Sequence, residues 1–336
     1  MQINSKNVET FDINNTLCES SQIAHNFNKM NIKEIGPTTK NICENIFEED
    51  LSIVTNELVN NHFKELNEGK EKRVRKQNIL NYINNRKINI REFFNWLLNN
   101  QNDSNSICLL GYLNYHGIEV NVNEQRALEL FQKAANLGNI IAELNLINMY
   151  IDGKAVCKNY EKAFELSKKL ADAGHSCGIN LLGYCYYNGI GTDVDMPKGV
   201  ELYQKTAKLG NCLALYNLAH IYKDGEGIEQ DHNKAFEFFK KSAEKEYSDG
   251  ITMLGYCYNN GIGTNINKKK AFESYQKAAY LGNHYAQTYL ALMYETGDEA
   301  GNGVEKNTKQ AIYWYKKAAK QGHEYAQYKL GELSKK

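Results

Sequence analysis

The chain has 336 residues, more than one hydrophobic core commonly supports, so length alone indicates two domains or an elongated array of repeats. Lysine plus arginine and aspartate plus glutamate each number 40, which excludes bulk charge as the means of holding nucleic acid or a membrane surface. The chain has 2 prolines and 23 tyrosines, which is typical of long helices with aromatic contacts and unlike a proline-rich linker.

The first 48 residues are rich in Asn, Ser, Thr and Lys without sustained apolar periodicity, so we expect a disordered tail over residues 1–48. The opening sequence MQINSKNVETFDINN lacks the apolar stretch of a signal peptide, and nowhere do about 18 apolar residues run together. These features favour a cytoplasmic location, with the nucleus as the alternative, and no insertion into a membrane.

Residues 49–102 carry three successive stretches with apolar residues at helical spacing. The three sets are Val54, Leu58, Phe63 and Leu66; Val74, Leu80 and Ile83; and Phe93, Phe94, Trp96, Leu97 and Leu98. We expect three helices that cap the first edge of a repeat array, because a terminal repeat otherwise leaves an apolar face in water. The run KEKRVRK, residues 70–76, fits a nuclear-import or nucleic-acid patch or a solvated helix face, and the lack of aromatic-basic alternation favours the solvated face.

Over residues 103–336 one pattern recurs every 36 residues, and the last step is lengthened to 40. One position, mostly Gly or Ala, marks each unit: Gly111, Ile147, Gly183, Ala219, Gly255, Ala291 and Gly331. The longer step results from extra residues between Asp298 and Asn302, which we place in a loop because loops tolerate insertions at little cost.

The second half of each unit is an amphipathic stretch that begins at a small residue and ends at a glycine. The small residues are Ala127, Ala163, Gly199, Ala235, Ala271 and Ala311, and the glycines are Gly138, Gly174, Gly210, Gly282 and Gly322. Glycine suits a helix end because the next residue often adopts a left-handed conformation. Glu246 replaces it in the fourth unit, at a cost of roughly 1 kcal/mol if that geometry is kept.

Each unit is therefore two helices with a glycine-bearing loop, too small to bury its own apolar face. Five tyrosines at 36-residue spacing are expected to fill the gaps between neighbours: Tyr150, Tyr186, Tyr222, Tyr258 and Tyr294. The prediction is an all-α fold in which stacked helix pairs form a solenoid.

These landmarks resemble the Sel-1-like repeat family, whose units read A-x-x-x-L-G-x-x-Y-x-x-G-x-G and then K-A-x-x-x-Y-x-K-A-A-x-x-G. Residues 286–322 match almost throughout, and six units plus a seventh first helix follow the frame. The resemblance implies a right-handed superhelix, related to tetratricopeptide solenoids, that assembles other proteins in signalling complexes or in membrane-protein degradation machinery.

A cysteine-rich branch of this family joins its units by disulfides and has been linked to hydrolase activity. Here the corresponding positions hold alanines, as in the pairs Ala135 and Ala142, Ala207 and Ala214, and Ala279 and Ala286. The eight cysteines show no regular pairing, so we interpret them as free thiols in a reducing compartment. The missing cross-links argue against the hydrolase alternative.

Residues 46–101 resemble the linker that joins a protein kinase domain to such repeats in expanded fungal families. The glycine-rich loop, the H-R-D motif and the D-F-G motif of kinases have no counterpart, so phosphoryl transfer by this chain is excluded. The linker resemblance implies an association with kinase signalling.

By analogy with tetratricopeptide solenoids, the first helix of each pair lines a concave groove. The residues placed there are Tyr112, Tyr115, His116, Asn180, Tyr184, Tyr187, Tyr216, His220, Tyr256, Asn259, Tyr285, Tyr325 and Tyr328. Rings with polar tips are typical anchors of protein interfaces. The alternative is that many of these tyrosines stack between repeats as core.

Motifs for chemistry have plainer explanations. The loops at residues 188–192 and 260–264, both N-G-I-G-T, follow no strand and lack the G-K-S/T of a phosphate-binding loop. His175, Cys177 and Cys185 do not make the four convergent ligands that zinc needs. We expect no catalytic, metal or cofactor site and predict a protein-interaction scaffold or adaptor. The alternative function is an adaptor of endoplasmic-reticulum-associated degradation. The lack of a signal peptide and of a membrane segment argues against this alternative.

Overall fold

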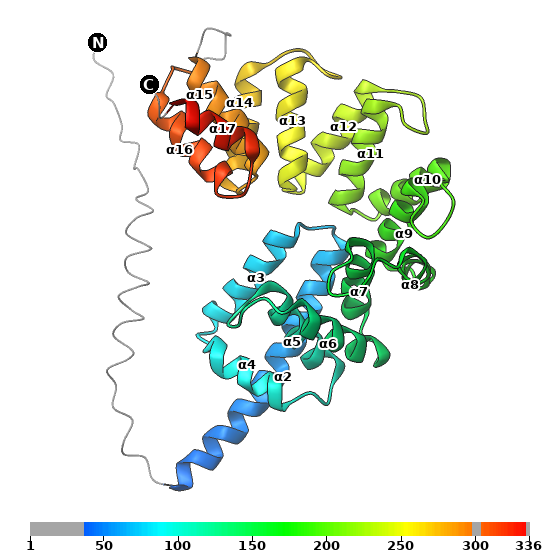
Figure 1. Ribbon diagram of the computed structural model, residues 1–336, viewed down its shortest axis with the longest axis vertical. Coiled ribbons are helices and arrows are strands. Elements are labelled where there is room, and N and C mark those ends of the chain that lie inside the picture. The colour runs from blue at the N-terminus through cyan, green and yellow to red at the C-terminus, as the bar shows by residue number, and fades with distance from the viewer. Residues whose placement is uncertain (1–36, 298–303, 334–336) are drawn as a thin grey trace, which may run out of the picture. The chain divides into compact units, whose positions relative to one another are not determined.

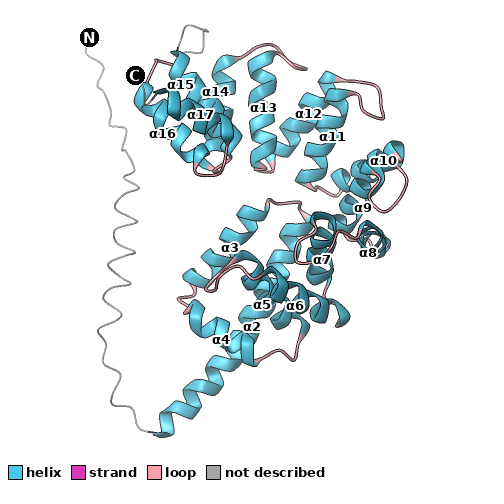
Figure 2. Cartoon of the chain, in the orientation of Figure 1, coloured by secondary structure: helices cyan, strands magenta, loops and turns pink. Residues whose placement is uncertain are grey.

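The computed structural model describes residues 37–297 and 304–333, with side chains from residue 50 onward. Over these ranges the chain forms 16 helices and no strand (Figures 1 and 2), which confirms the predicted all-α fold. The chain divides into two compact units, Met1–Asp50 and Leu51–Lys336, and the second contains every repeat. The expected insertion at residues 298–302 lies outside the described residues.

Three helices precede the repeats: α2 (Pro37–Asn67), α3 (Lys72–Asn85) and α4 (Ile90–Asn99). The expected boundary at residue 48 falls inside α2, and the part of the expected tail before residue 37 lies outside the described residues. Leu58 of α2, Ile83 of α3 and Phe93 of α4 are buried in the same apolar cluster as Leu110 of the first repeat. These helices therefore share a core with the start of the array.

From Ser104 onward the chain alternates between the two helices of successive repeats, each packing on the next helix in the chain. The first helices are α5 (Ser104–His116), α7 (Ile140–Asp152), α9 (Ser176–Asn188), α11 (Cys212–Asp224), α13 (Ser248–Asn260) and α15 (His284–Thr296). The second helices are α6 (Glu124–Asn136), α8 (Tyr160–Asp172), α10 (Met196–Lys208), α12 (His232–Glu244), α14 (Lys268–Tyr280) and α16 (Thr308–Ala319). The last helix, α17 (Glu324–Leu333), packs on α16 as the predicted closing helix.

Short polar residues begin the second helices. The side chain of each accepts a hydrogen bond from the backbone N–H three residues later, which satisfies a donor that the helix itself cannot pair. The six residues are Asn123, Asn159, Asp195, Asp231, Asn267 and Asn307. This recurring cap explains why the second helix starts at the same place in every unit.

The glycines predicted to end the second helices have the expected left-handed backbone, with φ between +81° and +87°. Glu246, which replaces glycine in the fourth repeat, adopts φ +61°. Helix α12 nevertheless has 13 residues, as α6, α8, α10 and α14 do. Glu246 therefore adopts the left-handed backbone conformation, and helix α12 keeps its length.

The glycine that marks the first, third and fifth units lies against an aromatic ring of the second helix, whereas a methyl group added at Gly331 in the closing helix would meet nothing within 4 Å. A methyl group added at Gly255 would lie 2.9 Å from the Tyr275 ring, and one at Gly111 would lie 2.9 Å from the Phe131 ring. Both rings are buried, so a larger residue would displace core side chains. Glycine at these two positions is thus a packing requirement.

Three of the five tyrosines predicted to fill the inter-repeat gaps meet an aromatic ring of the second helix before them. Tyr186 of α9 meets Phe164 of α8 edge to face with ring centroids 5.3 Å apart, and Tyr258 of α13 meets Phe236 of α12 at 5.4 Å. A lysine twelve residues later covers the outer face of the ring, as Lys198 does over Tyr186 at 4.0 Å. Tyr294 meets Phe272 of α14 at 5.6 Å, whereas Tyr222 stacks on Phe238 of its own repeat at 5.5 Å. The predicted ring contact between repeats is therefore confirmed for Tyr186, Tyr258 and Tyr294.

Candidate functional site

The residues predicted to line the groove lie on first helices, and their exposure changes along the array. Near the C-terminal end Tyr285, Tyr325 and Tyr328 are 52%, 44% and 62% exposed. Near the N-terminal end Tyr112 and Asn180 are buried, at 3% and 6%. One predicted surface thus has an open C-terminal part and a covered N-terminal part.

The open part is an aromatic patch formed by α15, α17 and the turn before α17. The patch consists of His284, Tyr285, His323, Tyr325 and Tyr328, with ring centroids 4.2 Å apart for His284 and Tyr285 and 5.3 Å for Tyr285 and His323. Burial, and then the nearby His284, lower the pKa of His323 below its ordinary value. Its ring is therefore neutral near pH 7, so the patch combines apolar faces with polar tips.

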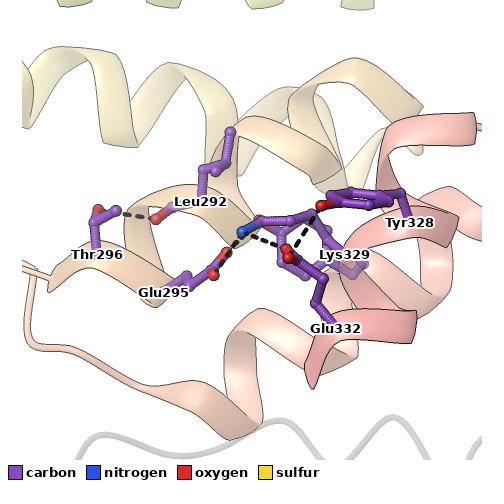
Figure 3. A network of polar contacts seen from close by, with 7 residues as sticks. Leu292, Glu295, Thr296, Tyr328, Lys329 and Glu332 are labelled. Atoms are coloured by element: carbon purple, nitrogen blue, oxygen red, sulfur yellow. Dashed lines mark hydrogen bonds and ion pairs between the residues drawn. The ribbon is translucent and has the colours of Figure 1, made fainter. Parts of the chain in front are cut away.

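Polar contacts hold one edge of this patch. The phenol of Tyr328 donates a hydrogen bond of 3.0 Å to Oε1 of Glu332, one turn later on α17. Figure 3 shows this pair beside Lys329, which reaches across to Glu295 of α15. This hydrogen bond orients the exposed Tyr328 ring along α17.

Tyrosines in the middle of the array are partly engaged. The Tyr187 phenol donates to Oε2 of Glu226 at 3.0 Å, and burial together with this bond raises its pKa to about 12. Tyr216 packs against Phe239 and Tyr247, with ring centroids 6.0 and 5.4 Å apart. Tyr184 is 38% exposed and is the most accessible of these three tyrosines.

Three further predicted residues in this region are half-buried. His220 packs on Tyr216 with ring centroids 4.6 Å apart. Tyr256 lies 6.4 Å from Tyr289, and Oδ1 of Asn259 accepts a hydrogen bond of 2.9 Å from Lys268. The core alternative thus describes Tyr216 and His220 better than the groove assignment does.

The N-terminal part is covered by α2 and α3. The Tyr112 ring lies 4.9 Å from His62 of α2, and Lys72 of α3 lies 4.5 Å from the centre of the Tyr115 ring. Nζ of Lys76 donates a hydrogen bond of 3.0 Å to the carbonyl of His116. Tyr112, Tyr115 and His116 were predicted as groove residues, and here they contact the chain's own helices.

Cationic groups gather in this covered region. Burial, followed by the charges of Arg75 and His116, lowers the pKa of His62 to about 3. Burial and then the neighbouring lysines lower the pKa of His116 to about 3 as well. Arg75 donates from Nε to the carbonyl of Lys70 at 3.0 Å and lies 3.2 Å from Nε2 of His62. The run at residues 70–76 is therefore only partly a solvated face, because Arg75 points into the protein.

A short segment from the last residue of α2 to the first turn of α3, residues 67–73, was not predicted as functional and contacts several first helices. We call it the docking segment. The carbonyl of Asn67 accepts hydrogen bonds of 3.0 Å from Ser176 and from Asn211, and the carbonyl of Glu68 accepts one of 2.8 Å from Cys212 N–H. No repetition in the sequence marks this segment, because each of its contacts occurs once.

Within the described residues no group of three or more His, Cys, Asp or Glu side chains could hold a metal ion, and none of the six described cysteines forms a disulfide. Cys185 lies 3.9 Å from Ser167 in the core. Burial raises the pKa of Cys177 to about 11, which keeps this thiol protonated near pH 7. None of the helices described is both long and apolar enough to cross a membrane.

Comparison with known proteins identifies the repeats. The Sel1 repeat model matches residues 104–139, 142–175, 178–211, 212–247, 248–283 and 284–323. A Sel1 repeat protein from Oxalobacter formigenes is 27% identical, with a TM-score of 0.56 over 68% of this chain and 90% of its own.

A second solved structure is c5321, a protective antigen of uropathogenic Escherichia coli with an SLR fold. It is 31% identical, with a TM-score of 0.49 over 76% of this chain and 55% of its own. No curated protein matches the sequence. Since the repeat model matches well over half of its residues, the chain belongs to the Sel1 repeat family.

Proposed function

We propose that this protein is a protein-interaction scaffold that binds a partner through the aromatic patch on α15 and α17. Sel1 repeat proteins typically serve as protein-interaction scaffolds. The observation that carries the proposal is the exposure of Tyr285, Tyr325 and Tyr328, at 52%, 44% and 62%, on adjacent first helices. The equivalent surface at the other end of the array is covered by the chain itself.

The chemistry of the patch fits a peptide or helix with an apolar anchor. Tyrosine contributes a large apolar face at low entropy cost, and its hydroxyl can pair with a polar group at the rim of an interface. The neutral His323 ring and the fixed Tyr328 ring add surface without a charge that must be desolvated. A partner that inserts a leucine or aromatic side chain between these rings would use this arrangement.

The partner class that we propose is a component of a kinase pathway. The support for it is the resemblance of residues 46–101 to the linker of fungal proteins that join a kinase domain to Sel1-like repeats. The chain would then bring pathway proteins together without itself transferring phosphate.

Proximity labelling with the full chain tests the binding surface. A variant with Tyr285, Tyr325 and Tyr328 replaced by alanine should lose most of the labelled partners while keeping its helical circular dichroism. The matched control replaces Tyr160, Tyr280 and Tyr313, which are 38%, 64% and 47% exposed and lie on second helices. Equal labelling by the two triple variants would refute the patch, and a partner set without kinases or their direct substrates would refute the pathway.

A further inference from the structure

The docking segment lies against the beginnings of four successive first helices. Asn67 and Glu68 contact the start of α9 and α11, the Glu71 carboxylate accepts a hydrogen bond from Ser248 N–H at the start of α13, and Nη1 of Arg73 donates one of 2.6 Å to the carbonyl of Gly282 just before α15. These partners lie 109 to 209 residues away in sequence. A seven-residue stretch thus contacts the starts of four of the seven first helices in the described part of the chain.

The contacts supply what two of these helices lack. A helix start leaves backbone N–H groups unpaired, and a nearby acceptor or negative charge stabilises it. Of the six first helices α5 to α15, all within the described part of the chain, only α9 and α13 have a starting residue without a side-chain cap: His175 and Tyr247. The docking segment provides both caps: Cys177 N–H donates to Oδ1 of Asn67 at 3.2 Å, and Ser248 N–H donates to the Glu71 carboxylate.

The docking segment also replaces a neighbouring repeat as the partner of one asparagine that begins a first helix. Asn139 and Asn283, at the starts of α7 and α15, each donate from Nδ2 to the start of the preceding first helix, Asn139 to Asn105 at 3.0 Å and Asn283 to Asp249 at 2.6 Å. The equivalent Asn211 donates to the carbonyl of Asn67 instead. The docking segment therefore takes a place that a neighbouring repeat holds elsewhere.

We propose that residues 67–73 are an autoinhibitory internal ligand of this surface, displaced by a partner segment that presents the same groups. Such a segment forms a turn between two helix ends and carries both acidic and basic side chains. It carries an amide and a carbonyl for α9 and α11, a carboxylate four residues later for α13, and a cation two residues after that. This goes beyond the aromatic patch, because the starts of α9, α11 and α13 form a separate binding surface.

Displacement is opposed by tethering. An internal segment on a short connection has an effective concentration on the order of millimolar, so a free peptide of equal intrinsic affinity cannot compete at micromolar concentration. Weakening the internal contacts should therefore expose the surface and raise the affinity for added peptide.

Glycine substitutions offer a matched pair for this test. A methyl group at Gly69 would overlap Oδ1 of Asn211, and Gly69 has φ +73°. Gly322 has φ +85°, but a methyl group there meets nothing within 4 Å. Gly69→Ala and Gly322→Ala thus impose similar backbone strain, and only the first disturbs docking. Gly282→Ala is a milder second variant, because its methyl group would meet only the guanidinium end of Arg73.

The probe is a fluorescein-labelled peptide of residues 64–76, KELNEGKEKRVRK, titrated against the full chain and its variants. Fluorescence anisotropy should show at least about tenfold tighter binding to Gly69→Ala and Gly282→Ala than to the native chain or Gly322→Ala. Hydrogen exchange should accelerate at the amides of Cys177, Cys212 and Ser248 in the same two variants. A peptide with Asn67→Ala and Glu71→Gln should bind more weakly.

Two results would overturn the proposal. Unchanged exchange at those three amides in both variants would mean that the docking segment does not cap the helices. Faster exchange without peptide binding would mean a fixed cap and no exchangeable surface. Neither readout involves Tyr285, Tyr325 or Tyr328. Failure of the docking-segment proposal would therefore not refute the aromatic patch, and failure of the patch would not refute the docking-segment proposal.

Discussion

Nζ of Lys329 in the closing helix lies 2.8 Å from Oε1 of Glu295 in α15, and both side chains are largely shielded, at 17% and 23% exposure. The phenol of Tyr315 donates to the other carboxylate oxygen of Glu295 at 2.7 Å. One carboxylate thus joins α15 to both α16 and α17; Figure 3 shows its pair with Lys329.

Glu295→Ala should therefore loosen the end of the array. Leaving a shielded cation and a phenol without their acceptor costs about 1–3 kcal/mol, and hydrogen exchange should accelerate first in α17. The control is Glu129→Ala, which breaks the Arg126–Glu129 pair, whose side chains are 45% and 52% exposed. That change should cost at most about 1 kcal/mol, and equal losses from the two variants would contradict the argument.

Comparing Asn283→Ala with Asn307→Ala measures how much a hydrogen bond between repeats adds to the stability that a helix cap alone provides. Both asparagines accept a backbone N–H at the start of a helix, Asn283 from Ala286 at 2.9 Å and Asn307 from Gln310 at 3.0 Å. A lost cap costs about 1 kcal/mol. Asn283 also donates to Asp249, so its variant should lose roughly 1 kcal/mol more in urea unfolding. A smaller loss for Asn283→Ala than for Asn307→Ala would show that the bridge adds nothing.

Glu246→Gly should stabilise the protein. Glu246 has φ +61° at a position where five other repeats have glycine, and its ion pair with Lys277, at 3.7 Å between exposed side chains, contributes little. Relief of the left-handed strain should raise the free energy of unfolding by roughly 0.5–1 kcal/mol. Glu237→Gly, at an exposed position in the middle of helix α12, should lower it by a similar amount. A lower melting temperature for Glu246→Gly would refute the strain argument.

Acid should destabilise the region where α2 and α3 meet the first repeat. The pKa of His62 is about 3 in the folded chain, below its ordinary value of 6.5, so only the unfolded chain binds a proton there between these values. Its contribution to stability is complete above about pH 6.5 and falls by up to roughly 1.4 kcal/mol per pH unit as the pH drops toward 3.

His116 titrates in the same direction and steepens the loss. Urea unfolding at about pH 7 and about pH 5.5 should show that His62→Gln depends less on pH than the native chain. An identical dependence for the two proteins would mean that His62 is solvated.

The repeats could be predicted from sequence because the same contact recurs in each unit. Gly111 and Gly255 each lie against an aromatic ring of the following helix, and Tyr186 and Tyr258 each meet a phenylalanine of the helix before. Recurrence at 36 residues turns such contacts into a visible period. The aromatic patch was found for the same reason, since Tyr285 and Tyr325 occupy equivalent positions in their units.

The covered end of the surface could not be predicted in this way. Arg73 and Gly282 meet across 209 residues, and no other unit repeats the contact. Tyr112 has the same position in its repeat as Tyr184, yet it is 3% exposed against 38%, because α2 lies over it. One signal was present: His175 and Tyr247 stand where Asn139, Asn211 and Asn283 cap their helices, which indicates that an outside group supplies the missing caps.

Arrays of this kind commonly grow or shrink by whole units, since each hairpin contacts only its neighbours. The docking segment has a fixed length, and Asn67, Glu71 and Arg73 each reach a different hairpin. An extra hairpin inserted between α9 and α15 would carry Gly282 out of reach of Arg73. The docking segment therefore fixes the number of hairpins between α9 and α15. A hairpin added beyond α15 would leave its contacts intact.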